Sequence, residues 1–221
     1  FARPDSVING CTVHDARIRA GKLLWKEHPV DADVVIGVPD SGLDAALGLS
    51  QAAHIPYEVG FIKNRYVGRT FIQPNQKMRT DSVRIKLNVV KSVVAGKRVI
   101  LVDDSIVRGT TCQRIVNLLR EAGATEVHMR ISCPPFTNPC HFGVDIDSKE
   151  NLIACQMTIP EICSHIGADT LGYLSVEGVQ SLATPEMKPQ CGFCTACFTG
   201  DYPIEVPKEM PKDKFEKKIG E

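Results

Sequence analysis

The sequence predicts an α/β fold in which a twisted, mainly parallel sheet is flanked by helices. Residues 98–102 are mostly branched and apolar without alternation, which is typical of a strand buried on both faces. Residues 111–122 then place their apolar side chains on one helical face. A second strand–turn–helix unit occurs earlier in the chain, over 33–54. Repeated units of this kind indicate parallel strands that are joined by helices.

Length and composition are those of an ordinary globular protein. The 221 residues suffice for one large domain, or for one domain with additions, and can bury a sizeable core. Hydrophobic residues make up 43% of the chain and charged residues 24%. The formal net charge of +0 argues against a nucleic-acid or membrane partner, and no apolar run approaches the ~18 residues of a membrane span. The chain starts at Phe1 and not at a methionine, so we expect a fragment or a processed product.

The first third of the chain predicts a helix, a strand and a second helix. An amphipathic helix is expected over 13–26, a buried strand over 33–38, and a helix that ends near residue 54. The strand and the second helix are joined by the turn Pro39-Asp40-Ser41-Gly42. A small polar turn at a helix N-terminus offers its amides to an anion, although a helix cap formed by Ser41 would explain the same residues.

A basic stretch follows a third predicted strand, which covers 57–62. Residues 63–74 read KNRYVGRTFIQP and show no regular period. Long irregular segments in compact domains are often functional lids. The stretch is therefore either a lid whose cations neutralise a pyrophosphate or a solvated basic face; the cations considered are Arg65, Arg69, Arg84 and Lys86. A helix is expected over 83–94, where Gly96 would end it.

Two carboxylates stand directly after the central strand. Asp103 and Asp104 follow residues 98–102, and ligands of open α/β sheets bind beyond the carboxyl ends of the strands. The turn into the next helix offers amides, hydroxyls and a cation to a phosphate; it contains Ser105, Arg108, Gly109, Thr110 and Thr111. Because carboxylates repel a phosphate, the acidic pair suits sugar hydroxyls or Mg²⁺. A ligand with a central ribose and a terminal phosphate fits both halves.

The remaining residues predict smaller elements and a segmented C-terminus. We expect a strand over 125–131, short helices over 150–155 and 160–166, and an edge strand over 172–176. We predict a main domain over 1–180, a cysteine-rich segment over 181–203 and a charged, mobile tail over 204–221.

The nine cysteines predict thiols and a metal site. An odd number in a chain with parallel-sheet patterns argues against a secreted disulfide framework and favours the cytoplasm. Cys191, Cys194 and Cys197 follow one another at C-x₂-C spacing. This spacing lets two thiolates bind one metal centre, in zinc sites and in iron–sulfur sites alike, so the spacing alone leaves both open.

The central stretch VDDSIVRGTT resembles the ribose-phosphate signature of the type I phosphoribosyltransferases. Within this superfamily, it is similar to the iron–sulfur type of the amidophosphoribosyltransferase family, the glutamine phosphoribosylpyrophosphate amidotransferases that open purine synthesis. Further stretches share the likeness, which covers nearly the whole chain up to Pro203: FARPDS at 1–6, GVPDSG at 37–42, KNRYVGRTFIQP at 63–74, REAGATEVH at 120–128 and CGFCTACFTGDYP at 191–203.

The resemblance implies a fold, a reaction and roles for the site residues. The chain would be the C-terminal phosphoribosyltransferase domain, with a cysteine-rich segment added, and would transfer the phosphoribosyl group of phosphoribosyl pyrophosphate to ammonia. Asp40 and Ser41 would meet the pyrophosphate, and Ser41 would approach Mg²⁺. Asp103 and Asp104 would hold the ribose hydroxyls and Mg²⁺. Two basic residues would act on the pyrophosphate from the flexible loop, Arg69 and Lys86.

The resemblance also implies a cluster and partners. Cys140, Cys191 and Cys194 would bind a [4Fe–4S] cluster, whose fourth ligand lies upstream of FARPDS in the family and is absent from this chain. The implied partners are an N-terminal glutaminase domain, purine nucleotides as feedback ligands, and further copies of the chain in a homo-oligomer.

Three other functions were weighed against this one. The first is a non-catalytic regulator of the same fold that senses the sugar phosphate; it would need a DNA-binding element or a basic face, and the net charge of +0 speaks against it. The second is a response-regulator receiver, but two strand units precede the acidic pair here. The third is a small iron–sulfur electron carrier, which would leave the phosphate turn unexplained.

Overall fold

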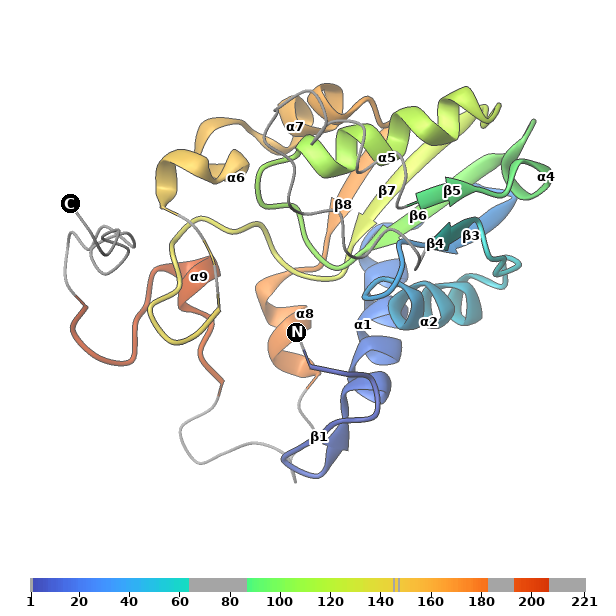
Figure 1. Cartoon of the computed structure of the whole chain (residues 1–221). Coiled ribbons are helices and arrows are strands. Elements are labelled where there is room, and N and C mark those ends of the chain that lie inside the picture. Colours follow the sequence, from blue (N-terminus) through green and yellow to red (C-terminus); the bar gives the residue numbers. More distant parts are fainter. Residues whose placement is uncertain (1, 64–86, 145, 147, 183–192, 207–221) are drawn as a thin grey trace, which may run out of the picture.

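The computed structural model describes residues 2–63, 87–144, 146, 148–182 and 193–206. Its centre is a four-stranded sheet in the order β3-β6-β7-β8, and every neighbouring pair is parallel (Figure 1). The predicted parallel sheet is therefore confirmed. Its strands are β3 (Val34–Gly37), β6 (Arg98–Asp103), β7 (Glu126–Ile131) and β8 (Thr170–Tyr173).

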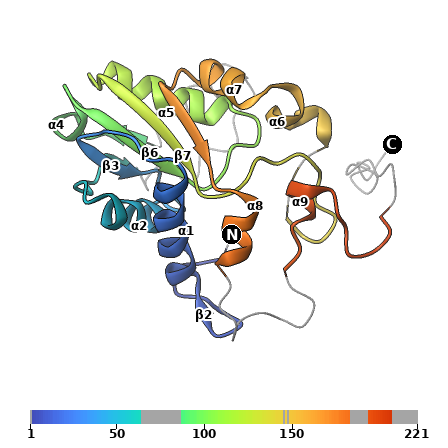
Figure 2. The ribbon, with the colours of Figure 1, turned by 180° about the vertical axis from the view of Figure 1, so that it is seen from behind.

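Helices cover both faces of this sheet, as the sequence predicts. On one face lie α5 (Thr110–Glu121) and α7 (Ile159–Ile166), and on the other lie α1 (Val13–Glu27) and α2 (Leu43–Ala53) (Figures 1 and 2). The helices predicted over 13–26, 111–122 and 160–166 are thus confirmed within one or two residues. Thr158 caps α7 and Glu161 completes the capping box, which fixes where this helix begins.

The two faces explain the unbroken apolar runs of the strands. In β6, Val99 and Leu101 pack in the cluster that contains α5, whereas Ile100 and Val102 pack in the cluster that contains α1 and α2. All four side chains are fully buried. Because β6 has a helix layer on each side and neither of its faces meets water, apolar residues are favoured on both faces.

Two predicted elements differ in the structure. The strand expected over 57–62 is reduced to β4 (Phe61–Lys63), and Tyr57 makes a single parallel bridge to Val35 of β3. The helix expected over 83–94 is wrong at β5 (Leu87–Val89), which is a strand, and is confirmed only over α4 (Lys91–Val94). The antiparallel pairing of β5 with β4 overrides the local helical pattern.

The C-terminal part contains further short elements. The helix expected over 150–155 is split into the 3₁₀ turn η2 (Lys149–Asn151) and α6 (Ile153–Gln156). The expected edge strand is β8, but it ends at Tyr173 because Ser175 caps the unpredicted helix α8 (Val176–Ser181). The elements β1 (Val7–Ile8), β2 (Cys11–Thr12) and α9 (Ala196–Thr199) were also not predicted.

The described helices include none that is long and apolar enough to cross a membrane. The division of the chain at residues 180 and 203 stays a prediction, since 183–192 and 207–221 lie outside the described residues.

Candidate functional site at the carboxyl edge of the sheet

Two of the segments singled out in the sequence meet at the carboxyl edge of the sheet. The turn over 38–42 follows β3, and the acidic pair with its turn begins at the last residue of β6. The amide of Val38 donates to the carbonyl of Val102 at 2.9 Å, so the first turn is fastened beside Asp103. Parallel neighbouring strands therefore deliver both predicted ligand segments to one place.

The two carboxylates of the acidic pair occupy different environments. The residue Asp103 is 7% exposed, whereas Asp104 is exposed to solvent. Burial, and then the neighbouring Asp104 carboxylate, raise the pKa of Asp103 from its usual 3.8 to about 8. The Asp104 amide donates to Asp103 Oδ1 at 2.9 Å, and the Ser105 hydroxyl donates to Asp104 Oδ1 at 3.0 Å. No cation among the described residues is shown paired with these carboxylate oxygens. Such oxygens fit a Mg²⁺ ion or sugar hydroxyls.

The turn into α5 has the geometry of a phosphate site. Gly109 stands before the helix and is buried. Its φ is 80°, a backbone conformation that residues with a side chain rarely adopt. The first amides of α5 point out of the helix without internal partners, and Thr110 and Thr111 are exposed beside them. The helix dipole adds to these donors, so an anion is favoured at this end of α5. Arg108 is exposed on the same turn.

Replacement of Gly109 by alanine is expected to weaken ligand binding as well as stability. A Cβ at this position would lie 2.6 Å from Cδ1 of Ile153, in addition to the strain of the positive φ. Gly96→Ala is the matched control, because Gly96 has a φ of 73° but nothing within 4 Å of an added Cβ. Both variants should lose roughly 1–2 kcal/mol of unfolding free energy. In a calorimetric titration, only Gly109→Ala should bind phosphoribosyl pyrophosphate more weakly. Equal binding by both variants would contradict the placement of the phosphate site at the start of α5.

The turn after β3 has no room for side chains at its glycines. A Cβ on Gly42 would lie 2.5 Å from the carbonyl oxygen of Val102, and one on Gly37 would lie 2.8 Å from the carbonyl oxygen of Gly42. Asp40 and Ser41 stand at the tip of this turn, and the peptide bond before Asp40 is cis. The Asp40 carboxylate is paired with the Lys63 ammonium at 2.6 Å. Lys63, the last residue of β4, was not singled out from the sequence because it stood among many cations of one stretch.

Several predicted site residues cannot be placed. Arg69, Lys86 and Cys191 lie outside the described residues, as do Arg65 and Arg84. The predicted roles of the basic stretch therefore stay predictions.

The cysteine segment docks against the loop that follows β7. The amides of Thr137 and Asn138 both donate to the carbonyl of Cys197 at 3.0 Å, and the rings of Phe136 and Phe198 stack with centroids 5.1 Å apart. The Tyr202 hydroxyl donates to the Pro139 carbonyl at 2.8 Å. These contacts bring the thiols of two distant segments to one side of the molecule.

The thiols gathered there are Cys140, Cys194 and Cys197. Burial, and then the neighbouring thiols of Cys140 and Cys194, raise the pKa of Cys197 to about 11. Among the described residues, no group of three or more His, Cys, Asp or Glu side chains is arranged to hold a metal ion. The described thiols thus suit a thiophilic metal by their chemistry, but they do not form a complete site by themselves.

A hollow of about 480 Å³ adjoins the acidic pair: Asp104, Ser132 and Cys133 line it together with Cys194 and residues of α1 and α8. Ser132 and Cys133 follow β7 at the carboxyl edge, and they belong to no motif that could be recognised in the sequence.

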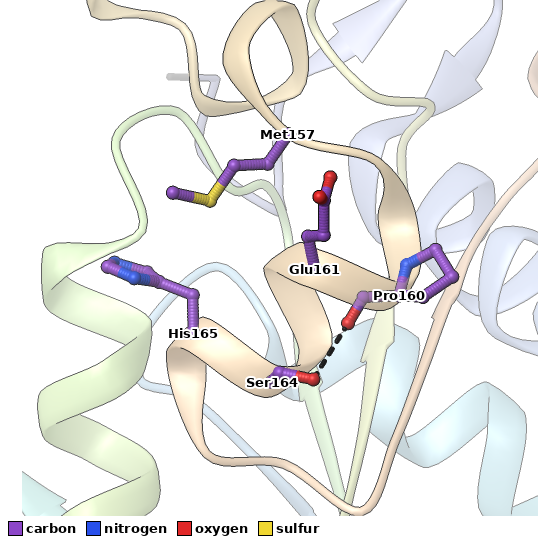
Figure 3. A pocket seen from close by; sticks show the side chains of 5 residues that line it. All are labelled: Met157, Pro160, Glu161, Ser164 and His165. Carbon is purple, nitrogen blue, oxygen red and sulfur yellow. Dashed lines mark hydrogen bonds between the residues drawn. The ribbon is translucent and has the colours of Figure 1, made fainter.

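Another hollow, of about 540 Å³, lies on α7 and is lined by Met157, Pro160, Glu161, Ser164 and His165 (Figure 3). Its polar groups are largely engaged. The Glu161 carboxylate accepts from the Thr158 amide at 2.7 Å, and the Ser164 hydroxyl donates to the Pro160 carbonyl at 3.1 Å. The carboxyl edge is therefore the better candidate for a reaction site.

Comparison with known proteins identifies relatives across almost the whole chain. A family model, the phosphoribosyl transferase domain, matches residues 15–166. An amidophosphoribosyltransferase of Synechocystis is 58% identical over 215 residues, which are 97% of this chain and 43% of that protein. An amidophosphoribosyltransferase of Bacillus subtilis is 58% identical over 207 residues, which are 93% of this chain and 44% of that protein.

Solved structures agree with these sequences. The structure of glutamine phosphoribosylpyrophosphate amidotransferase from B. subtilis in complex with ADP and GMP superposes with a TM-score of 0.86 at 56% identity, over 96% of this chain and 47% of that one. The structure of an allosteric regulatory enzyme of purine biosynthesis superposes with a TM-score of 0.85 at 57% identity, over 95% of this chain and 45% of that one. The chain therefore spans less than half the length of the relatives that it matches.

Proposed function

Because this chain belongs to the phosphoribosyl transferase domain family, we propose that its carboxyl edge transfers a phosphoribosyl group from phosphoribosyl pyrophosphate to ammonia. The products would be phosphoribosylamine and pyrophosphate, in the first step of purine synthesis. The observation that carries the proposal is the juxtaposition of three parts at one edge: a buried and an exposed carboxylate, a helix N-terminus with free amides, and a glycine turn. Relatives named amidophosphoribosyltransferase, at 58% identity, support ammonia as the acceptor.

Each part binds one portion of the substrate in this proposal. The amides and hydroxyls at the start of α5 bind the 5′-phosphate, which the helix dipole favours. Asp103 and Asp104 accept hydrogen bonds from the ribose hydroxyls. The turn with Asp40 and Ser41 lies beside Val102 and faces the pyrophosphate. The substrate is thereby held with its anomeric carbon between the acidic pair and the leaving group.

The reaction itself requires positioning and charge stabilisation more than proton transfer. The bond between the anomeric carbon and the pyrophosphate oxygen breaks, and its electron pair leaves with pyrophosphate. Positive charge develops on the sugar ring, which the Asp104 carboxylate can stabilise. Ammonia supplies the electron pair of the new carbon–nitrogen bond and then loses a proton to solvent. Since ammonia is already a nucleophile, the residues of the site need only orient it and exclude competing water.

The carboxylates and Ser41 also suit Mg²⁺, which binds oxygen ligands and commonly a phosphate of the substrate. When bound, the ion would neutralise charge on the pyrophosphate. Asp103, Asp104 and Ser41 are the residues that we propose to hold it.

The function can be tested on the chain as it stands. We expect pyrophosphate release from phosphoribosyl pyrophosphate with ammonium chloride, measured at a pH where free ammonia is appreciable. Glutamine at the same concentration should not support release, because the proposed site acts on ammonia itself. Release that depends on glutamine would show that the acceptor has been misassigned, and binding of phosphoribosyl pyrophosphate without release would favour the sensing function.

The cysteine segment suggests a cluster in the longer protein. We propose that Cys140, Cys191 and Cys194 hold a [4Fe–4S] cluster whose role is structural, tying the loop after β7 to the C-terminal segment. The docking of residues 196–202 on residues 136–139 supports this role. Cys197 is a competing ligand, since its thiol lies near Cys140 and Cys194.

Metal analysis distinguishes the candidates for this cluster. Full-length protein purified without oxygen should be brown and contain about four irons per chain. Cys194→Ala should lose the iron and the colour, whereas Cys112→Ala, at a thiol buried in the main core, should keep both. Zinc in place of iron in anaerobically prepared protein would contradict the proposal.

The proposal extends to partners and location. Purine nucleotides are proposed as feedback ligands, in line with the ADP and GMP bound to the B. subtilis relative. A glutaminase domain and further copies of the chain are proposed partners in the full-length protein. The cysteines of the described residues are free thiols, which supports a reducing compartment, the cytoplasm.

A further inference from the structure

We infer that His165 of α7 is a further binding residue for the 5′-phosphate of the substrate, and that it acts when its imidazole carries a proton. The inference rests on the proposed function, because it adds a side chain to the phosphate site at the start of α5. Its starting point is the position of the ring beside the phosphate turn: a Cβ added to Gly109 would lie 3.6 Å from Cδ2 of His165.

Two helices from later in the chain form a wall beside the phosphate turn. Helix α6 is fastened to the turn by the Ile153 amide, which donates to the Val107 carbonyl at 2.9 Å. Helix α7 is fastened to α5 by the side-chain amide of Gln113, which donates to the His165 carbonyl at 2.8 Å. The backbone of His165 is therefore held beside the first turn of α5 before any ligand binds.

The imidazole extends from this wall toward the turn. Figure 3 shows the ring of His165 standing off α7 on the side of α5, where it lines the hollow together with Met157. The residue is exposed, and no hydrogen bond or ion pair of its ring occurs within the described part of the chain. A ring in this place can donate to an anion at the start of α5, either directly or through one water.

The charged groups around the ring leave the histidine as the one that responds to pH. On α7, hydrogen bonds from the amide and the hydroxyl of Thr158 hold the pKa of Glu161 below its usual 4.5, so this carboxylate stays ionised above pH 5. Arg108 on the turn and Arg114 on α5 are permanent cations, and α6 carries no acidic or basic side chain. Histidine is the side chain that ordinarily changes its charge between about pH 5 and pH 8.

Protonation of the ring would add a positive charge beside a phosphate that the amides and hydroxyls of the turn hold by neutral donors. The contact is exposed to solvent, so it should strengthen binding by about three- to fivefold, as exposed ion pairs do. Because the imidazole gains its charge as the pH falls, this contribution is present at low pH and is lost as the pH rises.

Calorimetric binding of ribose 5-phosphate at pH 5.5 and pH 8.5 tests the inference, because this probe carries the phosphate without the pyrophosphate. At pH 5.5, His165→Gln should weaken binding about three- to fivefold, whereas at pH 8.5 it should change binding by less than about 1.5-fold. His165→Lys is charged at both pH values, so at pH 8.5 it should bind about three- to fivefold more tightly than the unaltered chain. The matched control is His54→Asn, at the exposed end of α2, where asparagine tolerates the φ of 55°; it should change binding by less than about 1.5-fold at either pH.

Comparison of the variants at each pH separates His165 from the other groups that titrate. Asp103, whose pKa is about 8, and the phosphate ester itself change their charge over the same range, but they do so in every variant alike. Equal weakening by His165→Gln at both pH values would overturn the inference, by showing that the ring only packs against the turn, and unchanged binding at both would overturn it as well. Either result would leave the proposed function intact. If the unaltered chain binds no ribose 5-phosphate at either pH, the proposed phosphate site fails, and this inference fails with it.

Discussion

In a chain that carries both Asp103→Asn and Asp104→Asn, the rate of pyrophosphate release is expected to fall at least about a thousandfold. Asparagine keeps the size of aspartate but removes the charge that stabilises the cationic sugar ring, and it weakens any bound Mg²⁺. Asp103 is the last ladder position of β6 and Asp104 follows it at the sheet edge, and neither side chain belongs to the clusters of the apolar core. The double variant should therefore fold.

Two measurements make this result interpretable. Circular dichroism and the melting temperature should show a folded chain, and Asp31→Asn, at an exposed position near the amino end of the sheet, should keep normal turnover. Calorimetry should show weaker binding of phosphoribosyl pyrophosphate in the presence of Mg²⁺. Turnover within tenfold of the unaltered chain would mean that the acidic pair does not face the substrate.

The layered architecture could be predicted because its signals are local. Unbroken apolar runs predicted β3 and β6, and one-sided apolar stripes predicted α1 and α5. The same reasoning placed Asp103 and the phosphate turn correctly at strand ends, since the end of a buried run is visible in the sequence.

The failures concern elements that depend on distant partners. Leu87 and Val89 lie in a strand because β4 is available for pairing, and the neighbouring residues in the sequence do not indicate this partner. Helix α8 begins where Ser175 caps it, and Glu27 at the end of α1 accepts hydrogen bonds from both the amide and the hydroxyl of that serine, at 2.8 and 2.7 Å. The contacts between Glu27 and Ser175 join residues 148 positions apart, and the partner strand of β5 likewise lies outside its local sequence, so local patterns do not predict either of them.

The two carboxylates of the acidic pair looked equivalent in the sequence, but burial separates them. Asp103, the last residue of β6, is buried while Asp104 beyond the strand faces solvent. This difference predicts a dependence of stability on pH.

The ligand-free chain is expected to lose stability between about pH 4 and pH 8 because of Asp103. The pKa of this carboxyl is about 8 in the folded chain and near 3.8 in the unfolded chain, so the unfolded state releases its proton first. The folded state is therefore favoured fully below pH 4, and this advantage is lost as the pH rises through 8. Asp103→Asn stays neutral throughout, and at pH 8.5 it should be more stable than the unaltered chain by on the order of 3–5 kcal/mol.

Urea unfolding at pH 5 and pH 8.5, with a chelator present, measures this difference. The gain from Asp103→Asn should be small at pH 5 and large at pH 8.5, and Asp104→Asn should give a smaller gain, because it removes only the neighbouring charge that raises the pKa of Asp103. A gain that is equal at both pH values would mean that Asp103 is ionised in the folded chain. Asp103, which we propose to hold Mg²⁺ as an anion, would thus destabilise the empty site. Mg²⁺ with pyrophosphate should therefore remove most of the difference between the two chains, because it would stabilise only the unaltered one.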